Sequence, residues 1–227
     1  MRLLAFDTSG AALSAAAAED DDLRAWLHEP LERGHAERLL PMLRRVMGEA
    51  GWSWADLDMV AVTIGPGQFT GLRAGIAVAG ALALALKLPV AGIGTLEVVA
   101  EAAAGRRPDL ELPIAVALDA RRDEAYHQLF AADLRPLGPP ALLPLRELRG
   151  EGRCLLAGDA GLWMRAMVDR DDPVVEAAPD ARYLAAMARR RCREGDAPTV
   201  ATAPRPVYLR PPDARIGAGA SLVAATS

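Results

Sequence analysis

The chain has 227 residues, of which 52% are hydrophobic, so it is long enough to bury a sizeable core in one large or two small domains. Its formal net charge of -4 excludes an electrostatic surface for holding nucleic acid alone, because the phosphate backbone selects for clustered cations. The two cysteines, Cys154 and Cys192, form no Cys-x-x-Cys motif, and no secretory leader is evident, which predicts a protein of the reducing cytoplasm.

The first half of the chain predicts a meander of three strands. A strand over residues 3–6 leads through the turn DTSG at residues 7–10 into a second strand over residues 11–18, and a third strand follows over residues 23–28. The later elements are a helix over residues 35–50, a strand over 57–64, a helix over 70–87, a strand over 90–93 and a helix over 95–104. Strands that run into crossover helices indicate a mixed sheet covered by helices.

The second half repeats this opening after a linker at residues 105–108. A strand over residues 114–118 leads through DARR at residues 119–122 into a strand over residues 124–131, so two units of strand, Asp turn and strand lie just over a hundred residues apart. The later elements are a strand over residues 154–157 and helices over 160–168 and 180–193. The expected division is residues 1–108 and 109–212 as two similar α/β subdomains, followed by a disordered tail at 213–227.

Residues 65–73, GPGQFTGLR, connect a predicted strand to a long apolar helix, which is how α/β proteins build ligand or contact sites. The run is not a Walker loop, because the only lysine of the chain, Lys87, lies far along the helix. It is not a dinucleotide fingerprint either, because Thr70 stands where the third glycine belongs. A structural corner between strand and helix and a nucleotide-binding loop both remain open.

The duplicated halves resemble the actin-like ATPase architecture of sugar kinases, Hsp70 and actin, which is also called the ASKHA or RNase H-like fold. In that fold two aspartate-bearing turns face each other across a cleft that binds phosphates and magnesium. The resemblance makes Asp7, Thr8 and Asp119 the candidate cofactor-binding residues. Aspartate also favours turns through its own local hydrogen bonds, so a structural role for both turns stays open.

Six segments together resemble the bacterial TsaB (YeaZ) family. They are DTS at residues 7–9, His35 with LLP at 39–41, GPGQFTGLR at 65–73, PVAGIGTLE at 89–97, DARRDEAY at 119–126 and PVYLR at 206–210. The resemblance implies a non-catalytic subunit of the machinery that places threonylcarbamoyl on the adenosine beside the anticodon of tRNAs reading codons that begin with A. The implied partners are the catalytic paralogue TsaD, the ATPase TsaE and a second copy of the chain, with tRNA reached only through the complex and no membrane contact.

The histidines agree with a supporting role. The catalytic paralogue holds its metal with two histidines one turn apart on a helix, a spacing that puts both rings on one face. Here His35 is followed by Leu39 at that spacing, and His28 and His127 show no ligand spacing. The resemblance therefore implies no catalytic residue, no metal site and no cofactor in this chain, with ATP and metal on the partner.

The helix over residues 70–87 carries small residues every four positions. This stripe consists of Gly71, Gly75, Ala79 and Ala83, with Gly80 beside it. Because a glycine inside a helix costs roughly 1 kcal/mol relative to alanine, a close contact is expected to compensate, either with a partner or with the chain's own sheet. These five residues, and Met42 on the preceding helix, form the candidate interface. The apolar stretch at residues 74–86 is expected to be too short for a membrane span.

A rival hypothesis is a self-sufficient actin-like kinase or ATPase in which Asp7 and Asp119 hold magnesium and phosphates. Such an enzyme should lose turnover when either aspartate becomes alanine. A supporting subunit should instead lose function mainly when a helix face is altered.

Overall fold

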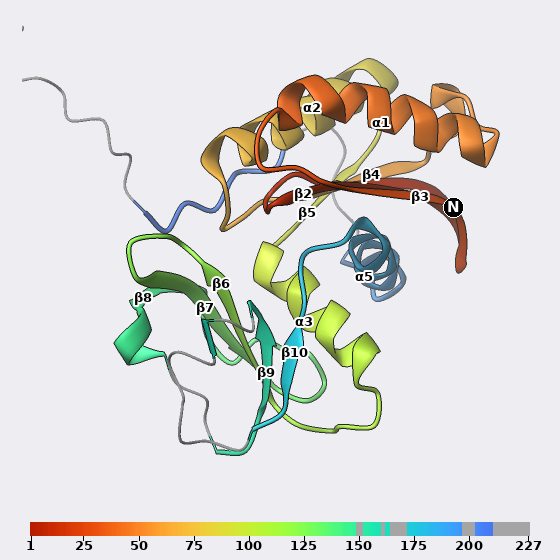
Figure 1. The fold of residues 1–227 in the computed structure, drawn as a ribbon. Coiled ribbons are helices and arrows are strands. Elements are labelled where there is room, and N and C mark those ends of the chain that lie inside the picture. Colours follow the sequence, from red (N-terminus) through yellow and green to blue (C-terminus); the bar gives the residue numbers. More distant parts are fainter. Residues whose placement is uncertain (149–151, 160–161, 164–171, 197–202, 211–227) are drawn as a thin grey trace, which may run out of the picture.

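The computed structural model describes residues 1–148, 152–159, 162–163, 172–196 and 203–210, which form two five-stranded sheets (Figure 1). The first sheet has the spatial order β3-β2-β1-β4-β5, and its strands are β1 (Arg2–Asp7), β2 (Ala12–Glu19), β3 (Asp22–Pro30), β4 (Met59–Thr63) and β5 (Val90–Ile93). The second has the order β10-β9-β6-β7-β8, and its strands are β6 (Ile114–Asp119), β7 (Glu124–Phe130), β8 (Ala141–Pro144), β9 (Leu155–Gly158) and β10 (Val174–Glu176).

The two sheets have the same topology. In each, the first strand pairs antiparallel with the second and parallel with the fourth, so β1 corresponds to β6 and β2 to β7. The third and fifth strands complete both sheets with the same pairing. The predicted duplication with mixed sheets is therefore confirmed, and the two Asp-bearing turns occupy equivalent positions.

In the described part of the chain, four helices cover these sheets. They are α1 (His35–Ala50), α2 (Phe69–Leu86), α3 (Thr95–Arg106) and α5 (Ala181–Arg193), and short 3-10 turns lie at Trp54–Asp56 and Leu145–Glu147. Helices α1 and α2 lie on one face of the first sheet, whereas α3 and α5 lie between the two sheets (Figure 1). The first sheet is thus a layer between helices on both sides.

The central strand β1 shows why its sequence is a continuous apolar run. Leu4 and Phe6 point into the core that contains α1 and α2, whereas Leu3 and Ala5 point into the core that contains α5. All four side chains are buried. A strand covered on both faces needs apolar residues at every position instead of an alternating pattern.

The helices between the sheets are exchanged between the two halves of the sequence. Helix α3 precedes residue 108 but packs Leu96 and Val99 against the second sheet. Helix α5 follows residue 108 but packs Leu184 and Ala188 against the first sheet. The strands before residue 108 thus form the first sheet and those after it form the second, while α3 and α5 each pack on the sheet of the other half.

Two strands were not expected from the sequence. Strands β8 and β10 have four and three residues, and they form the outer edges of the second sheet. The helix expected over residues 160–168, apart from its two residues at 162–163, and the tail expected over 213–227 lie outside the described residues.

Candidate functional site

The loop that precedes α2 is held by backbone hydrogen bonds of this chain. The amide of Gln68 donates to the carbonyl of Ser9 at 2.8 Å, and the amide of Thr95 donates to the carbonyl of Gly65 at 2.8 Å. Gly65 has a φ of 108°, which favours glycine. Its contacts make the loop a corner between β4, β5 and the turn after β1, so the structural interpretation of GPGQFTGLR accounts for these glycines.

Asp7 is buried beneath this corner and is only 1% exposed. Its Oδ1 atom accepts hydrogen bonds from the Ser9 amide at 3.1 Å, the Ser9 hydroxyl at 2.6 Å and the Thr63 hydroxyl at 2.6 Å, while Oδ2 has no partner among the described residues. Burial raises the pKa of Asp7, because the charged carboxylate is disfavoured away from water. In this conformation the carboxylate of Asp7 is therefore enclosed and serves as an acceptor for its own turn and for Thr63.

Thr8 and the small residues of α2 close over the same turn. A side chain on Gly71 would overlap the carbonyl oxygen of Thr8, and one on Gly75 would overlap the Thr8 hydroxyl. Thr8 is fully buried, and its hydroxyl has no hydrogen-bond partner among the described residues. Gly71 and Gly75 therefore let α2 approach the turn after β1. This contact within the chain offsets the free-energy cost of placing glycine inside a helix.

The remaining candidate interface residues differ in their burial. Ala79 and Ala83 are buried in the core between the first sheet and helices α1 and α2, together with Met42 from α1. Gly80 is half-buried, and a side chain there would meet Ala203 at 2.8 Å. Met42, Ala79 and Ala83 face the interior of this chain, whereas Gly80 also lines a cavity beside α2.

His35 begins α1 and is 5% exposed, and its Nε2 atom has no hydrogen-bond partner among the described residues. Leu39 lies one turn further along α1 and is fully buried. Among the described residues, no group of three or more His, Cys, Asp and Glu side chains is placed to hold a metal ion. His127, also buried, donates a hydrogen bond from Nδ1 to the Val116 carbonyl oxygen at 2.8 Å, and is a core residue of the second half.

Asp119 contrasts with its counterpart Asp7, because it is exposed. Its Oδ1 atom accepts a hydrogen bond from the Arg121 amide at 2.8 Å, which is the local turn interaction that aspartate favours. The turn continues through Arg121, Arg122 and Asp123, all with positive φ between 56° and 65°. Neither Asp7 nor Asp119 lines the cavity beside α2 or the cavity between β5 and α5.

A different face of α2 is uncovered. The helix has 18 residues and a mean hydropathy of 1.7, so by length and composition it could cross a membrane, which corrects the expectation of a stretch too short for this. Core helices pass the same test, and α2 packs on β4 and α1. Only 33% of it is buried, however, and Ala77, Ala81, Leu84 and Ala85 remain exposed, with Leu84 at 79%. These four residues are called the outer face of α2.

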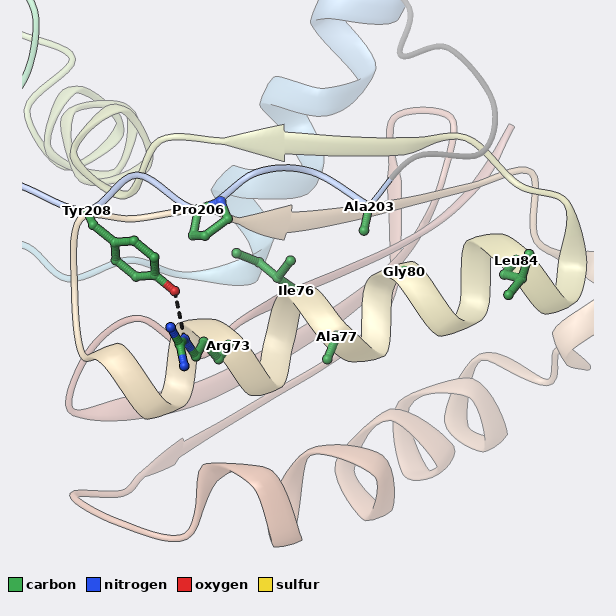
Figure 2. Close-up of a pocket in the computed structure, with 8 residues that line it drawn as sticks. All are labelled: Arg73, Ile76, Ala77, Gly80, Leu84, Ala203, Pro206 and Tyr208. Carbon is green, nitrogen blue, oxygen red and sulfur yellow. Dashed lines mark hydrogen bonds between the residues drawn. The ribbon is translucent and has the colours of Figure 1, made fainter. Parts of the chain in front are cut away.

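A cavity of about 640 Å³ lies beside this face, between α2 and the extended segment at residues 203–210 (Figure 2). At one end, the Arg73 guanidinium carbon lies 3.8 Å from the centre of the Phe69 ring. Arg73 Nε donates to the Tyr208 hydroxyl at 3.0 Å, and the two aromatic rings are 5.3 Å apart. Phe69, Arg73 and Tyr208 lie in segments of the family resemblance, but no local pattern predicts their contact, because Arg73 and Tyr208 are 135 positions apart.

Comparison with known proteins identifies the family. A family model described as TsaD, tRNA N6-adenosine threonylcarbamoyltransferase, matches residues 29–139. The protein from Escherichia coli K12 described as tRNA threonylcarbamoyladenosine biosynthesis protein TsaB is 38% identical over 133 residues, which cover 59% of this chain and 56% of that protein. The solved structure of YeaZ from Pseudomonas aeruginosa is 33% identical with a TM-score of 0.82, and the match covers 92% of this chain and 99% of that one. The chain belongs to the TsaB (YeaZ) family.

Distantly related proteins share the fold of this TsaB-family chain. The inorganic polyphosphate/ATP-glucomannokinase from Arthrobacter sp. strain KM has a TM-score of 0.50 at 12% identity, with 85% of this chain and 99% of that chain covered. This likeness concerns the fold alone, which is two tandem actin-like subdomains. The chain matches 56% of the length of E. coli TsaB. The family resemblance and the fold class predicted from the sequence are both confirmed.

Proposed function

We propose that this TsaB-family chain is a non-catalytic subunit that supports a paralogous, metal-dependent transferase. That transferase places threonylcarbamoyl on the adenosine beside the anticodon of tRNAs that read codons beginning with A. The protein works in the cytoplasm, and ATP and metal belong to its partners. The TsaD-like paralogue is the main partner, TsaE is the associated ATPase, and a second copy of the chain is the alternative occupant of the same surface.

The observation that carries this proposal is the outer face of α2. Helix α2 has 18 residues, a mean hydropathy of 1.7 and only 33% of its length buried, so it leaves an apolar face in water. Single exposed apolar residues are normal, but a continuous strip on one helix marks a contact surface. Leu84, at 79% exposure, is the largest side chain of this strip. Membership of a family whose curated relatives are described as tRNA threonylcarbamoyladenosine biosynthesis proteins supports the choice of partner.

The aspartate turns support a subunit without its own chemistry. Asp7 and Thr8 are buried beneath α2, and the carboxylate of Asp119 accepts a hydrogen bond from the Arg121 amide in its own turn. A phosphate-binding cleft would need both turns open toward one ligand. The net charge of -4 likewise supports reaching tRNA through the complex instead of alone.

The test is co-purification of the tagged full chain from extracts of its own cells, with the TsaD-like paralogue identified by mass spectrometry. Leu84→Glu places a charge on the outer face of α2 and is expected to weaken paralogue recovery at least about tenfold, as for a central interface residue. Leu23→Glu is the matched control, because Leu23 is an exposed leucine of β3, at 49% exposure, away from α2. This control should behave like the wild type.

Absence of the paralogue from the wild-type sample would contradict the proposed function. Recovery that is equal for wild type, Leu84→Glu and Leu23→Glu would keep the partner but move its docking surface away from the outer face of α2. Both variants should fold, since each substituted side chain is exposed.

A further inference from the structure

The segment at residues 203–210, called the C-terminal strap, packs closely against three glycines. Three glycines from different elements leave the room that it occupies, because a Cβ atom at any of them would come within 3 Å of it. The approaches are 2.6 Å from Gly65 to the Val207 carbonyl, 2.6 Å from Gly92 to Pro204 and 2.8 Å from Gly80 to Ala203. The Val207 amide also donates to the Ile64 carbonyl at 2.7 Å. The C-terminal strap is therefore a fixed part of the surface beside α2.

The C-terminal strap reaches both halves of the fold. Arg210 forms an ion pair with Glu124 of β7. At its other contact, the strap brings Tyr208 to Phe69 and Arg73 at the start of α2. Tyr208 is thereby held in place to orient the arginine.

Arg73 is oriented but not neutralised. Its guanidinium stacks on Phe69 and uses Nε to bind the Tyr208 hydroxyl. Its two terminal amino groups have no acceptor, and it has no carboxylate partner, among the residues that the structure describes. Phe69 and Tyr208 remain 46% and 42% exposed. An arginine held on aromatic rings with its outer edge open is suited to bidentate recognition of an anion.

The cavity of about 640 Å³ begins at this arginine and continues between α2 and the C-terminal strap (Figure 2). Its walls are otherwise mainly aliphatic and include Ile76, Leu84 and Pro206. Leu84 belongs both to this groove and to the outer face of α2. The groove is thus continuous with the surface on which the proposed function places the partner.

We propose that this groove receives a segment of the catalytic paralogue that carries a carboxylate beside an aliphatic side chain. The carboxylate pairs with the outer edge of Arg73, and the aliphatic side chain lies between Ile76, Leu84 and Pro206. This inference rests on the proposed function, and it names the residues that give the contact its specificity. A phosphate chain is disfavoured as the occupant, because such a ligand needs several cations and only Arg73 among the groove's described lining residues is charged.

The test is the affinity of the purified full chain for the purified paralogue, measured by titration calorimetry at low and at raised salt. Arg73→Gln is expected to weaken binding about 10- to 100-fold and to reduce its salt dependence, because a partner carboxylate is left unpaired. Arg73→Lys keeps the charge but loses the planar fork and should be intermediate. Tyr208→Phe keeps the ring but removes the hydroxyl that orients Arg73, so it should weaken binding by a smaller factor.

Arg153→Gln is the matched control, since Arg153 is an exposed arginine of the other half. It should bind the paralogue like the wild type, and Arg73→Gln should melt at the wild-type temperature. Wild-type affinity of Arg73→Gln, combined with loss of binding by Leu84→Glu, would overturn this inference while the proposed function stands. Loss of tRNA binding by Arg73→Gln with unchanged paralogue affinity would also overturn it. A wild-type chain that does not bind the paralogue at all would overturn both.

Discussion

Asp7 is a buried acceptor on which three donors converge. Replacement by alanine leaves the Ser9 amide, the Ser9 hydroxyl and the Thr63 hydroxyl without their common acceptor. Asp7→Ala should therefore lower the free energy of unfolding by roughly 3 kcal/mol. Asp7→Asn keeps an oxygen at that position and should cost less. Urea unfolding of the three proteins measures this order, and Asp7→Ala at wild-type stability would show that the turn does not depend on the carboxylate.

The pKa of Asp7 gives the same residue a signature in pH. Burial raises this pKa above 3.8, so above about pH 3.8 the folded chain keeps a proton that the unfolded chain releases. The contribution of Asp7 to the free energy of unfolding therefore falls as the pH rises from the unfolded to the folded pKa. Asn does not titrate. The cost of Asp7→Asn should therefore be smaller at pH 7 than at pH 4. An equal cost at both values would contradict a raised pKa.

His127 predicts the opposite dependence in the second half. Burial lowers the pKa of His127 from 6.5, since the charged imidazolium is disfavoured away from water. Below about pH 6.5 the unfolded chain then binds a proton that the folded chain does not, and stability falls by at most about 1.4 kcal/mol per pH unit. His127→Phe should flatten this slope between pH 7.5 and 5.5 in urea titrations. A parallel slope in both proteins would assign the acid sensitivity elsewhere.

At the residue scale, the sequence located the Asp turns but not their environments. Asp7 and Asp119 follow equivalent strands, yet one is buried and the other exposed. The difference arises because Gly71 and Gly75 let α2 close over the first turn. No local pattern around Asp7 contains that contact, which joins positions more than sixty residues apart.

One face of helix α2 packs against this chain, and the opposite face is exposed. Its glycine face packs on Thr8, so Gly71→Ala should lower the free energy of unfolding by about 1 to 3 kcal/mol through overpacking. Gly48→Ala in α1 is the matched control, because nothing lies within 4 Å of its added Cβ, and it should stabilise the chain by up to about 1 kcal/mol. Thermal or urea unfolding measures both. Stabilisation by Gly71→Ala would show that α2 does not rest on the turn.

The elements differ in how much the sequence revealed. The helix at residues 35–50 and the strand at 90–93 match α1 and β5 to the residue, because each is long or strongly apolar with clear flanking signals. Strands β8 and β10 were missed because they are short and flanked by prolines, so only their pairing with β7 and β9 defines them. Small-residue spacing predicted close contact by α2 but not which element it contacts.

Helices α3 and α5 join the two halves of the molecule, because each packs on the sheet formed by the other half of the sequence. Residues 1–108 alone lack α5, which leaves the face of the first sheet with Leu3, Met59 and Ile93 uncovered. This fragment is therefore expected not to fold cooperatively, and circular dichroism melts of the fragment and the full chain measure the difference. Cooperative melting of the isolated fragment, with the sheet content of the intact first half, would show that the exchanged helix is dispensable.

The most direct measurement of the central claim is the threonylcarbamoyladenosine content of tRNA from cells depleted of this chain, determined by nucleoside mass spectrometry. Depletion should remove the modified nucleoside. Complementation with the wild type or Asp119→Ala should restore it, whereas Leu84→Glu should not, because a supporting subunit needs its docking face and not the exposed aspartate. Unchanged modification after depletion would contradict the proposed function. Restoration by Leu84→Glu but not by Asp119→Ala would contradict a supporting role and favour an enzyme that uses Asp119.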